Sequence, residues 1–478
     1  MTPSADRDRD FRAVVRLALP AIATSLLQTL VFLVDRLVLG HHSETSLAAM
    51  QTAGPIVWSV FSVFSAFTVG TIAVVGRAIG ARDANAASSA ARGSLAIAVC
   101  LGIAVGLLSF ALLDPILDAF GPAGGAAVRA ASRNYMAISL PALPIYFVGL
   151  TSISILQAAG DTRTPLAIGI VTNLVNVALN WVLVFGHLGF RAMGTRGSAW
   201  ASVVAATFES ALGVALLLSA RTPVRIRESA SRRAATTEGS AAVVDTADSE
   251  SASRRAATTQ VDTVEGARRV LRVSVGSWGE LAIKHAGYLM FVGFVVSLGS
   301  AAMAANQALI SIESIAFLTA DGCAVAAGAL VAQRLGASDP AGAKRAGWIS
   351  VALCASLLGA CGVMFFAIPG TLVGSFRDDP AIIAAGVSAL RVDAFAQIPM
   401  AVAVVLAQSM RGAGATREAL AVTFTGGLAV RLAVTWVMVA KLRLGLMGVW
   451  IGSSVDWFSR SIVYAIRWRA GAWARTRV

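Results

Sequence analysis

The chain has 478 residues, of which 56% are hydrophobic and only 14% charged, and its mean hydropathy is +0.73. A soluble protein of this size needs far more charge to cover its surface, so the composition argues against a soluble enzyme. The formal net charge of +13 would suggest nucleic-acid binding in a soluble protein, but the basic residues lie between apolar segments and indicate membrane topology instead.

The apolar segments, taken in chain order, predict twelve membrane-spanning helices, because each is long enough to provide the roughly 20 residues that a span requires. The predicted helices cover 14–39, 47–77, 90–113, 127–157, 165–187, 195–220, 270–298, 302–333, 346–370, 381–410, 418–440 and 445–466. Since twelve is an even number, both chain ends are expected on the same side of the membrane. The fold class that follows is an all-α membrane protein.

The distribution of Lys and Arg predicts which side that is. The predicted loops and ends on the side of the termini contain sixteen Lys and Arg residues, and those on the opposite side contain seven. Loops rich in Lys and Arg stay in the cytoplasm, so both termini are predicted to be cytoplasmic in a multi-pass protein of the cytoplasmic (inner) membrane. The first apolar segment is too long for a cleavable signal peptide, and none is expected.

Residues 221–269 interrupt the apolar pattern and are rich in Ser, Ala, Thr, Arg and acidic residues. The heptamer SRRAATT occurs at 231–237 and again at 253–259. This composition predicts a disordered cytoplasmic linker between an N-lobe, residues 1–220, and a C-lobe, residues 270–478. The linker is either a regulatory or lipid-surface segment or a plain tether.

The two halves of the chain repeat each other in sequence order. With a shift of 256, residues 80–83 fall on 336–339, and with a shift of 254, residues 160–163 fall on 414–417. Six helices per half give both halves the same membrane orientation, so they are predicted to form two six-helix bundles related by a pseudo-two-fold, parallel repeat axis. Transporters of this kind hold a substrate between or within the halves. A channel or a membrane-bound enzyme has no such need for duplication.

Several motifs, in this order and spacing, resemble the multidrug and toxic compound extrusion (MATE) family. They are LALP at 17–20, LAAMQTAGPI at 47–56, GRAIGARD at 76–83, LQAAGDTRTP at 156–165, NVALNWVLVFG at 176–186, GALVAQRLGASDP at 328–340 and MRGAGATRE at 410–418. The resemblance covers the whole chain except the linker. It implies export of small organic, often cationic compounds in exchange for H⁺ or Na⁺, which act as coupling ions rather than cofactors. We expect a monomer in the lipid bilayer that binds no nucleic acid.

A finer resemblance to the DinF-like branch of that family implies roles for individual residues. That branch has a proline and an aspartate in its first helix, which Pro20 and Asp35 match, and a hydroxyl residue at the start of its sixth helix, which Ser198 matches. Its fifth helix has an asparagine, matched by Asn176, and an aspartate four residues later, where this chain has Asn180 instead. Cation coupling is therefore expected at Asp35, Asn176, Asn180 and Ser198, and bending of the first helix at Pro20.

The residues themselves support part of this reading. An ionisable group in an apolar segment usually faces a cavity or a partner, which marks Asp35 as a candidate. It lies about 30 Å along its predicted helix, however, so Asp35 and Arg36 are alternatively a marker of the outer membrane interface. Asn173, Asn176 and Asn180 recur on one helical face, which suits either a polar cavity with a Na⁺ shell or interhelical hydrogen bonds.

These observations lead to a hypothesis for coupling. Binding of H⁺ or Na⁺ at Asp35 changes its hydrogen bonds and lets the first helix bend at Pro20, where a backbone hydrogen bond is missing. Bending shrinks the cavity of the first half and expels the substrate outward. An amide at Asn180 in place of a carboxylate removes one negative charge and therefore favours H⁺ over Na⁺, although a Na⁺ ion bound by Asp35, Asn176 and Asn180 stays an alternative. No other metal site is expected.

The second half has its own intramembrane charges. Glu280 and Lys284 lie one helical turn apart, and Arg431 and Asp456 are expected to form a pair between neighbouring helices. These four residues are either secondary coupling candidates or structural ion pairs. The resemblance favours a coupling role for Glu280, because a related branch uses acids in its seventh and tenth helices. Other acids within predicted helices are Glu209, Glu313, Asp321 and Asp393.

Three other functions compete with an efflux antiporter. A flippase for lipid-linked oligosaccharide or peptidoglycan precursors shares a related fold, but it typically needs a strongly basic cavity, and acids predominate here in the first half. An ion channel or sensory protein would need a filter-like loop, and a membrane enzyme would need a clustered catalytic set; the sequence shows neither. It also contains no GxxxxGK[ST] motif, so ATP is not expected as the energy source.

Overall fold

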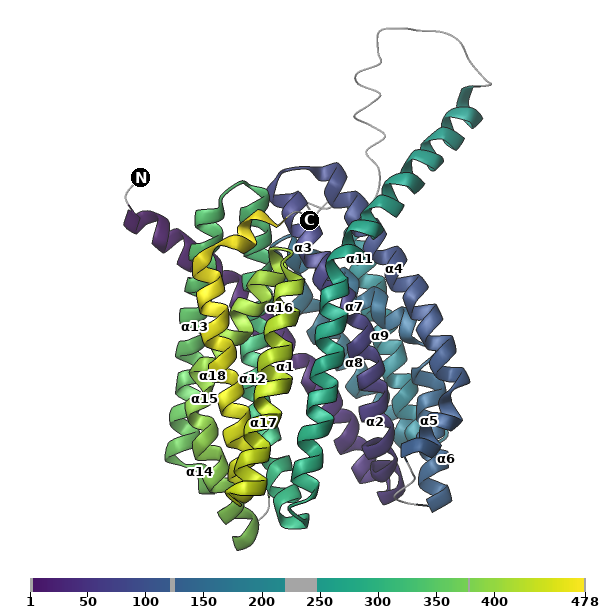
Figure 1. Ribbon diagram of the computed structural model, residues 1–478. Helices are drawn as coiled ribbons and strands as arrows, with labels where there is room; N and C mark the ends of the chain where they lie inside the picture. Colours follow the sequence, from purple (N-terminus) through teal and green to yellow (C-terminus); the bar gives the residue numbers. More distant parts are fainter. Residues whose placement is uncertain (1–2, 121–124, 220–246, 377–378, 477–478) are drawn as a thin grey trace.

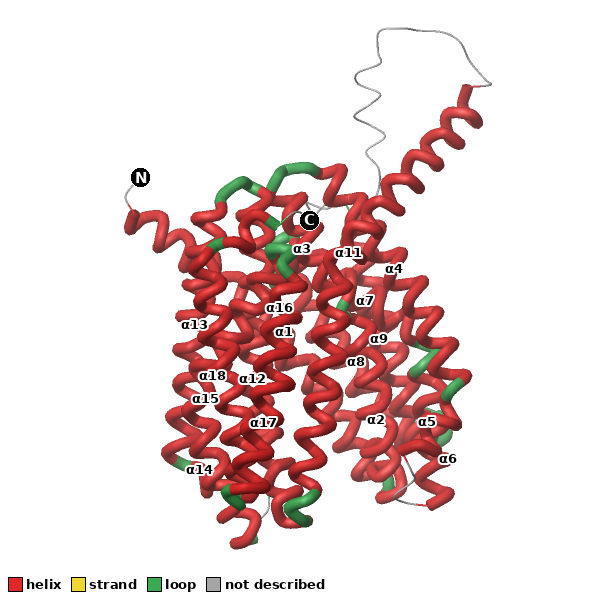
Figure 2. The backbone as a smooth tube through the Cα atoms, in the orientation of Figure 1, coloured by secondary structure: helices red, strands yellow, loops and turns green. Residues whose placement is uncertain are grey.

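The computed structural model describes residues 3–120, 125–219, 247–376 and 379–476. The described residues form helices joined by short turns, with no strand among them (Figure 2). Both ends of the described chain, residues 3–12 and 470–476, lie at the same end of the helical bundle, here named the terminal face (Figure 1). The other end is named the opposite face.

The first half contains six membrane-spanning segments. Its helices are α1 (Pro3–His42), α2 (Glu44–Ser65), α3 (Phe67–Gly80), α4 (Ala84–Ala111), α5 (Leu113–Phe120), α6 (Gly125–Ser139), α7 (Leu143–Ala158), α8 (Arg163–Phe185) and α9 (Thr195–Leu218). Helices α2 and α3 together form one span, and α6 and α7 form another that is bent by 54°.

The second half repeats this plan. Its elements are α11 (Ala247–Val296), α12 (Ser300–Gly336), α13 (Pro340–Ala367), α14 (Pro369–Gly374), α15 (Pro380–Gly412), α16 (Thr416–Thr423), η1 (Phe424–Val430), α17 (Arg431–Trp436), η2 (Val437–Lys441), α18 (Gly445–Ala470) and η3 (Ala472–Arg475). The stretch from α16 to η2 is one span with two π-helical segments.

The predicted number of spans is confirmed. By length and hydropathy, nine helical segments of the described chain are able to cross a membrane, and the bent pair α6 and α7 makes a tenth. Helices α1, of 40 residues, and α18, of 26 residues, are less apolar but long enough to cross a membrane, and they bring the number to twelve. The hydropathy of α18 is lower because Asp456 and Arg460 lie within it.

The prediction of a disordered linker is wrong for its second part, because α11 begins at Ala247 and residues 247–269 are helical. The physical reason is visible in the sequence. This stretch is rich in Ala and Arg, lacks proline, and ends with an ion pair between Glu265 and Arg269, one turn apart, at 3.1 Å. The rest of the predicted linker, residues 221–246, lies outside the described residues.

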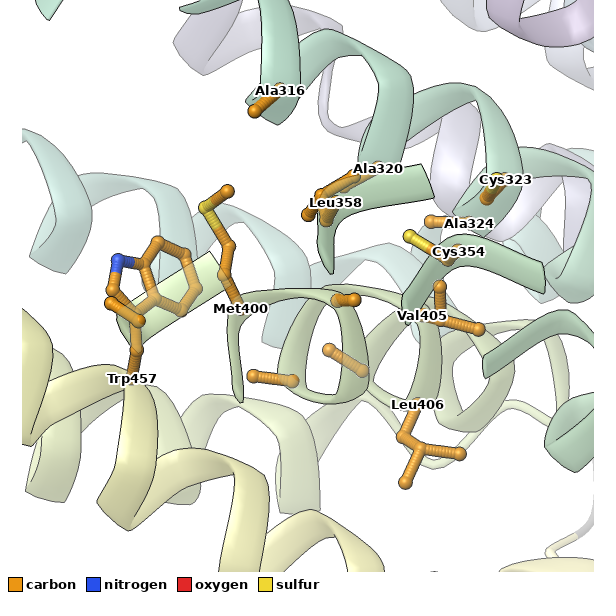
Figure 3. Close-up of a cluster of buried hydrophobic side chains, with 14 of the residues drawn as sticks. Ala316, Ala320, Cys323, Ala324, Cys354, Leu358, Met400, Val405, Leu406 and Trp457 are labelled. Atoms are coloured by element: carbon orange, nitrogen blue, oxygen red, sulfur yellow. The ribbon is translucent and has the colours of Figure 1, made fainter. Parts of the chain in front are cut away.

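Each lobe has its own hydrophobic core, and the first helix of each lobe reaches into the core of the other. Ala18 and Ile22 of α1 pack into the C-lobe core, part of which is shown around Met400 and Leu358 in Figure 3. Val270 and Val273 of α11 pack into the N-lobe core. Helices α1 and α11 occupy equivalent places in the two repeats, so this reciprocal exchange is what a pseudo-two-fold axis between the lobes requires.

Helices α1 and α12 cross at very close range. A Cβ atom on Gly322 would lie 2.3 Å from the Cα of Ile22, so only glycine fits at this crossing. Beside it, the Oγ of Ser25 donates a hydrogen bond of 3.3 Å to the Oδ2 of Asp321. The C-lobe therefore touches α1 within a few residues of Pro20.

Further contacts join the lobes near the terminal face. The Nη1 of Arg77 on α3 donates to the carbonyl of Thr476 at 2.7 Å, and the Nε2 of Gln333 on α12 donates to the carbonyl of Ala158 at 2.6 Å. Asp10, at the start of α1, is buried and paired with Arg334 and Arg345 of the C-lobe. These contacts hold the two lobes together at the end of the bundle where the chain begins and ends.

Candidate functional site

Asp35 is buried within the N-lobe, with 2% of its surface exposed. Its Oδ1 accepts a hydrogen bond of 2.7 Å from the Nδ2 of Asn180 on α8, and its Oδ2 accepts one of 3.0 Å from the Oγ of Ser202 on α9. The carboxylate therefore faces the interior of the lobe rather than water. Such burial is not what a solvated marker of the membrane interface predicts, and it favours the interpretation of Asp35 as an internal site.

Asn176 completes the arrangement. Its Nδ2 donates to the Oγ of Ser202 at 3.3 Å, and its Oδ1 accepts from the Nδ2 of Asn180 at 3.1 Å. Asn176 and Asn180 are four residues apart on α8, so their side chains share one face of that helix. Asp35, Asn176, Asn180 and Ser202 thus form one network that joins α1, α8 and α9, here named the Asp35 network.

The Asp35 network has one carboxylate, and within the described chain this carboxylate has no ion pair with Lys or Arg. Only neutral amide and hydroxyl groups donate to it. A buried carboxylate without a positive partner is energetically costly. The network is therefore suited to bind a cation at Asp35 and to release it again.

The orientation of the Asn180 amide determines which cation the Asp35 network is able to bind without a rearrangement of this side chain. Asn180 turns its Nδ2 toward Asp35, while its Oδ1 is buried without a hydrogen bond in the described structure. The orientation of an amide follows from its hydrogen bonds, so a turn of the Asn180 amide would present oxygen instead. In its present orientation Asn180 offers a donor rather than an oxygen to Asp35, so a Na⁺ ion shared by the two residues would require that turn. No group of three or more His, Cys, Asp and Glu side chains suited to a metal occurs in the described part.

Two residues predicted for coupling lie outside the network. Ser198 is fully buried, and its hydroxyl has no hydrogen bond within the described residues. Asn173 donates to the carbonyl of Gly169 in its own helix at 2.8 Å. Sequence reasoning missed Ser202, which lies one turn after Ser198 on the same face of α9. The i, i+4 spacing was the available signal.

Pro20 lies within α1, which is helical on both sides of it. Proline leaves one backbone hydrogen bond of the helix unmade. The Oγ1 of Thr24, one turn later, donates to the carbonyl of Pro20 at 2.9 Å. The position is thus a local weakness in the helix that also contains Asp35, fifteen residues further along.

Glu280 of α11 is the centre of a charged cluster in the C-lobe. Its Oε1 lies 3.0 Å from the Nζ of Lys284 and 2.6 Å from the Nη2 of Arg411 on α15, which confirms the predicted pair and adds a second cation. The hydroxyl of Thr423 also donates to Glu280 at 3.0 Å. Arg411 was missed because the sequence placed it in a loop, whereas α15 continues to Gly412.

A second cluster contains the predicted pair of Arg431 and Asp456. The Nε of Arg431 lies 3.3 Å from the Oδ2 of Asp456, which is fully buried. Arg460, one turn after Asp456 on α18, makes a closer contact of 2.5 Å with the same oxygen. Nearby on α15, Asp393 is fully buried and accepts a hydrogen bond of 2.8 Å from Gln397. The C-lobe acids are thus separate from the Asp35 network.

Comparison with known proteins agrees with this arrangement. The MatE family model matches residues 20–182 and again residues 279–437, one match in each lobe. The chain belongs to the MatE family. The two matches also agree with the repeat found in the sequence, and members of the MatE family are membrane transporters rather than enzymes.

Individual relatives of this MatE transporter cover nearly its whole length. A probable multidrug resistance protein NorM of Thermotoga maritima is 27% identical over 470 residues, which are 98% of this chain and 94% of the relative. A MOP superfamily transporter from Pyrococcus furiosus has the same fold, with a TM-score of 0.83 at 19% identity over 98% of this chain and 97% of the other.

A further solved structure, described as the outward-facing conformation of a multidrug resistance MATE family transporter, has a TM-score of 0.82 at 19% identity. It covers 97% of this chain and 96% of the other. Because the known structures share twelve membrane-spanning helices, they confirm the predicted fold class. The closer resemblance to the DinF-like branch stays a prediction.

Proposed function

We propose that this MatE transporter is a cation-coupled antiporter that exports amphipathic, often cationic organic compounds by alternating access, and that its coupling ion is H⁺ rather than Na⁺. The observation that supports coupling is the Asp35 network. It contains a buried carboxylate with neutral donors only, on the same helix as Pro20. The relative from Thermotoga maritima is named as a probable multidrug resistance protein, which supports organic substrates.

In the proposed cycle, a proton neutralises Asp35 and weakens its hydrogen bonds to Asn180 and Ser202. Helix α1 is then free to change its shape near Pro20, where its backbone hydrogen bonding is incomplete. Since α1 packs against both lobes, a change of its shape alters the N-lobe interior and the crossing with α12 together. The substrate leaves toward the opposite face, and the terminal face is proposed to be cytoplasmic in the inner membrane of the cell.

The flippase alternative finds less support in the side chains. A cavity for a pyrophosphate needs basic groups that are free to bind it. Here the intramembrane guanidinium groups are already paired, Arg411 with Glu280 and Arg431 with Asp456. The N-lobe contributes the acids Asp35 and Glu209 instead. These charges fit a cationic substrate better than an anionic one.

The test is efflux of ethidium from proteoliposomes that contain the wild type or Asp35→Asn, driven by a proton gradient alone and then by a Na⁺ gradient alone. We expect the proton gradient to drive efflux by the wild type and Asp35→Asn to abolish it. Asp118→Asn, the same chemical change at an exposed acid of α5, is the control and should transport normally. Thermal unfolding in detergent verifies that each variant is folded.

Other outcomes would change the proposal in defined ways. Efflux that requires Na⁺ would make the oxygens of Asn176 and Asn180 part of an ion shell and would refute proton coupling. Efflux by Asp35→Asn at the wild-type rate would refute the role of the Asp35 network. A wild type that moves no dye under either gradient would contradict multidrug export and favour lipid-linked substrates.

A further inference from the structure

Glu209 is a second acid inside the N-lobe, and the Asp35 network does not include it. It lies near the middle of α9 and is half-buried. Within the described residues, its carboxylate has neither a hydrogen bond nor an ion pair. An ionisable side chain within a membrane helix is costly unless it faces a cavity or meets a partner, so an unpartnered one indicates a function.

The position of Glu209 on α9 relates it to the Asp35 network. It follows Ser202 by seven residues, which is two helical turns and about 10 Å along the axis. Residues seven apart lie on the same face of a helix. Helix α9 runs from the opposite face toward the terminal face, so Glu209 lies deeper in the lobe than Asp35, on the side of the terminal face.

Helix α7 packs against α9 at the level of Glu209. The Oγ of Ser210 donates to the carbonyl of Ile145 at 2.6 Å and fixes the two helices together there. Across from Glu209, α7 has a glycine: a Cβ atom on Gly149 would lie 3.7 Å from the carboxyl carbon of Glu209. The Oγ of Ser210 would lie 2.9 Å from the same Cβ atom, so glycine lets α7 and α9 approach closely and places the Glu209 carboxyl against this part of α7.

A row of aromatic side chains begins on α7 close to Gly149 and extends to α2. Tyr146 lies three residues, about one turn, before Gly149 on α7. Its ring centroid is 6.4 Å from that of Phe61 on α2, and Phe61 is in turn 5.8 Å from Trp58. An acid beside a row of aromatic rings is the combination that recognises organic cations, because the faces of the rings attract positive charge and the rings also bind the apolar body.

We propose that Glu209 binds the positive charge of an organic cation, while Trp58, Phe61 and Tyr146 contact its apolar parts. Glu209 and Asp35 then have different tasks. Asp35 is already satisfied by two donors and exchanges the coupling ion, whereas Glu209 has no donor of its own and receives its positive partner from the substrate. This inference rests on the proposed export of cations and assigns the substrate charge to one residue.

The experiment measures equilibrium binding of tetraphenylphosphonium to the purified protein in detergent, in the absence of any gradient. We expect Glu209→Gln to raise the Kd for this cation by about tenfold or more, since it removes an ion pair at a partly desolvated site. Glu44→Gln, the same change at an exposed acid of the opposite face, should leave the Kd unchanged. Binding of the neutral compound chloramphenicol should be the same in wild type and Glu209→Gln.

Two further variants separate this proposal from the coupling proposal. Asp35→Asn should lose transport yet keep the Kd for tetraphenylphosphonium within about threefold of the wild type, a difference below 1 kcal/mol. Glu209→Asp keeps the negative charge on a shorter side chain and should bind tetraphenylphosphonium with an affinity between those of the wild type and Glu209→Gln. If Glu209→Gln does not fold, the Kd of Glu209→Asp tests the cation site instead, and a wild-type Kd would then overturn the assignment. An unchanged Kd in Glu209→Gln would overturn the assignment, as would a loss of proton coupling in Glu209→Gln with normal binding.

The binding assay is informative even if transport is not driven by protons. A wild type that binds tetraphenylphosphonium through Glu209 but exports nothing would refute the antiporter and leave the cation site intact. If the wild type and Glu209→Gln export ethidium equally well, the antiporter proposal stands and the cation site is refuted.

Discussion

The Nδ2 of Asn180 and the Oδ1 of Asp35 lie 2.7 Å apart, so an amide occupies the place where the DinF-like pattern has a second carboxylate. We predict that Asn180→Asp makes transport Na⁺-dependent. Two carboxylates at this distance repel each other unless a cation lies between them, and carboxylate oxygens suit hard cations. The measurement is dye efflux under a Na⁺ gradient alone, which should be stimulated in Asn180→Asp relative to the wild type.

Thermal unfolding in detergent gives a second reading of the same change. Na⁺ should raise the unfolding temperature of Asn180→Asp and leave that of the wild type unchanged, because a ligand stabilises only the state that binds it. K⁺ serves as the control ion at the same ionic strength. If Na⁺ stabilises both proteins equally, the amide does not select the coupling ion.

Ser202, rather than Ser198, is predicted to matter for coupling. The hydroxyl of Ser202 contacts both Asp35 and Asn176, whereas that of Ser198 has no hydrogen bond in the described structure. Ser202→Ala leaves one oxygen of a buried carboxylate without its donor, which costs about 1–3 kcal/mol. Efflux driven by a proton gradient should therefore be slowed in Ser202→Ala and nearly normal in Ser198→Ala. The reverse order would return the role to Ser198.

Asp456 is predicted to be more important for stability than either of its basic partners. Removing this fully buried acid leaves Arg431 and Arg460 side by side without a negative charge, and breaking a buried ion pair in this way costs about 3–5 kcal/mol. Arg431→Gln keeps the closer pair of Asp456 and Arg460 and should cost less. Thermal unfolding in detergent would rank the two variants, and equal losses would show that Arg431 is the principal partner.

The architecture could be predicted from the sequence, because membrane spans appear as apolar segments and the duplication appears as recurring motifs. Twelve apolar segments and the alternation of basic loops predicted most helix ends to within about six residues, although α1 begins at Pro3 and α11 at Ala247, well before the predicted 14 and 270. The same reasoning failed at residues 247–269, where polarity was taken for disorder although a polar segment rich in Ala and Arg is also able to form a helix.

The sequence predicted the Asp35 network only in part. Asp35, Asn176 and Asn180 were identified, since an acid in an apolar segment and amides on one helical face are visible in one dimension. Ser202 was missed, because Asp35 on α1, which its hydroxyl contacts, lies far away in the chain. Spacing along one helix shows which side chains share a face, but only packing shows what that face contacts.

Asp339 at the terminal face gives a prediction for pH dependence. Burial alone raises the pKa of this carboxyl, but a 2.7 Å hydrogen bond from the amide of Gly342 and the charge of Arg334 outweigh it and hold the pKa below its usual value. A lowered pKa in the folded state means that the charge adds stability above about pH 4 and that this is lost as the pH falls through the lowered value.

The corresponding variants separate the charge from the helix cap. Asp339→Ala removes the cap of α13 and should cost about 1 kcal/mol at neutral pH, whereas Asp339→Asn keeps a capping oxygen and should lose less. The difference between wild type and Asp339→Asn should stay constant from about pH 8 to pH 5 and shrink below about pH 4. Unfolding temperatures followed by tryptophan fluorescence measure this, and a difference that persists at low pH would show that charge is not its cause.

The hydrogen bond between Ser25 and Asp321 is predicted to stabilise the present arrangement of the lobes. It joins α1 to α12 at 3.3 Å, beside the close crossing at Gly322 and five residues after Pro20. If α1 changes shape during transport, this contact is among the first that must break. Ser25→Ala should therefore shift the lobes toward their other arrangement by about 0.5–1.5 kcal/mol, which is about a two- to tenfold change in the population ratio.

The shift is measurable as a change in the distance between spin labels on exposed residues of the opposite face, Glu44 in the N-lobe and Ala301 in the C-lobe, in a background without reactive cysteines. Ser311→Ala is the matched control, because the hydroxyl of Ser311 donates to the carbonyl of Gln307 in its own helix. Asp321→Asn combined with Ser25→Ala should shift the distances little further than Asp321→Asn alone, since both remove one contact. Fully additive shifts would mean that the two residues act independently and that the contact does not hold the lobes.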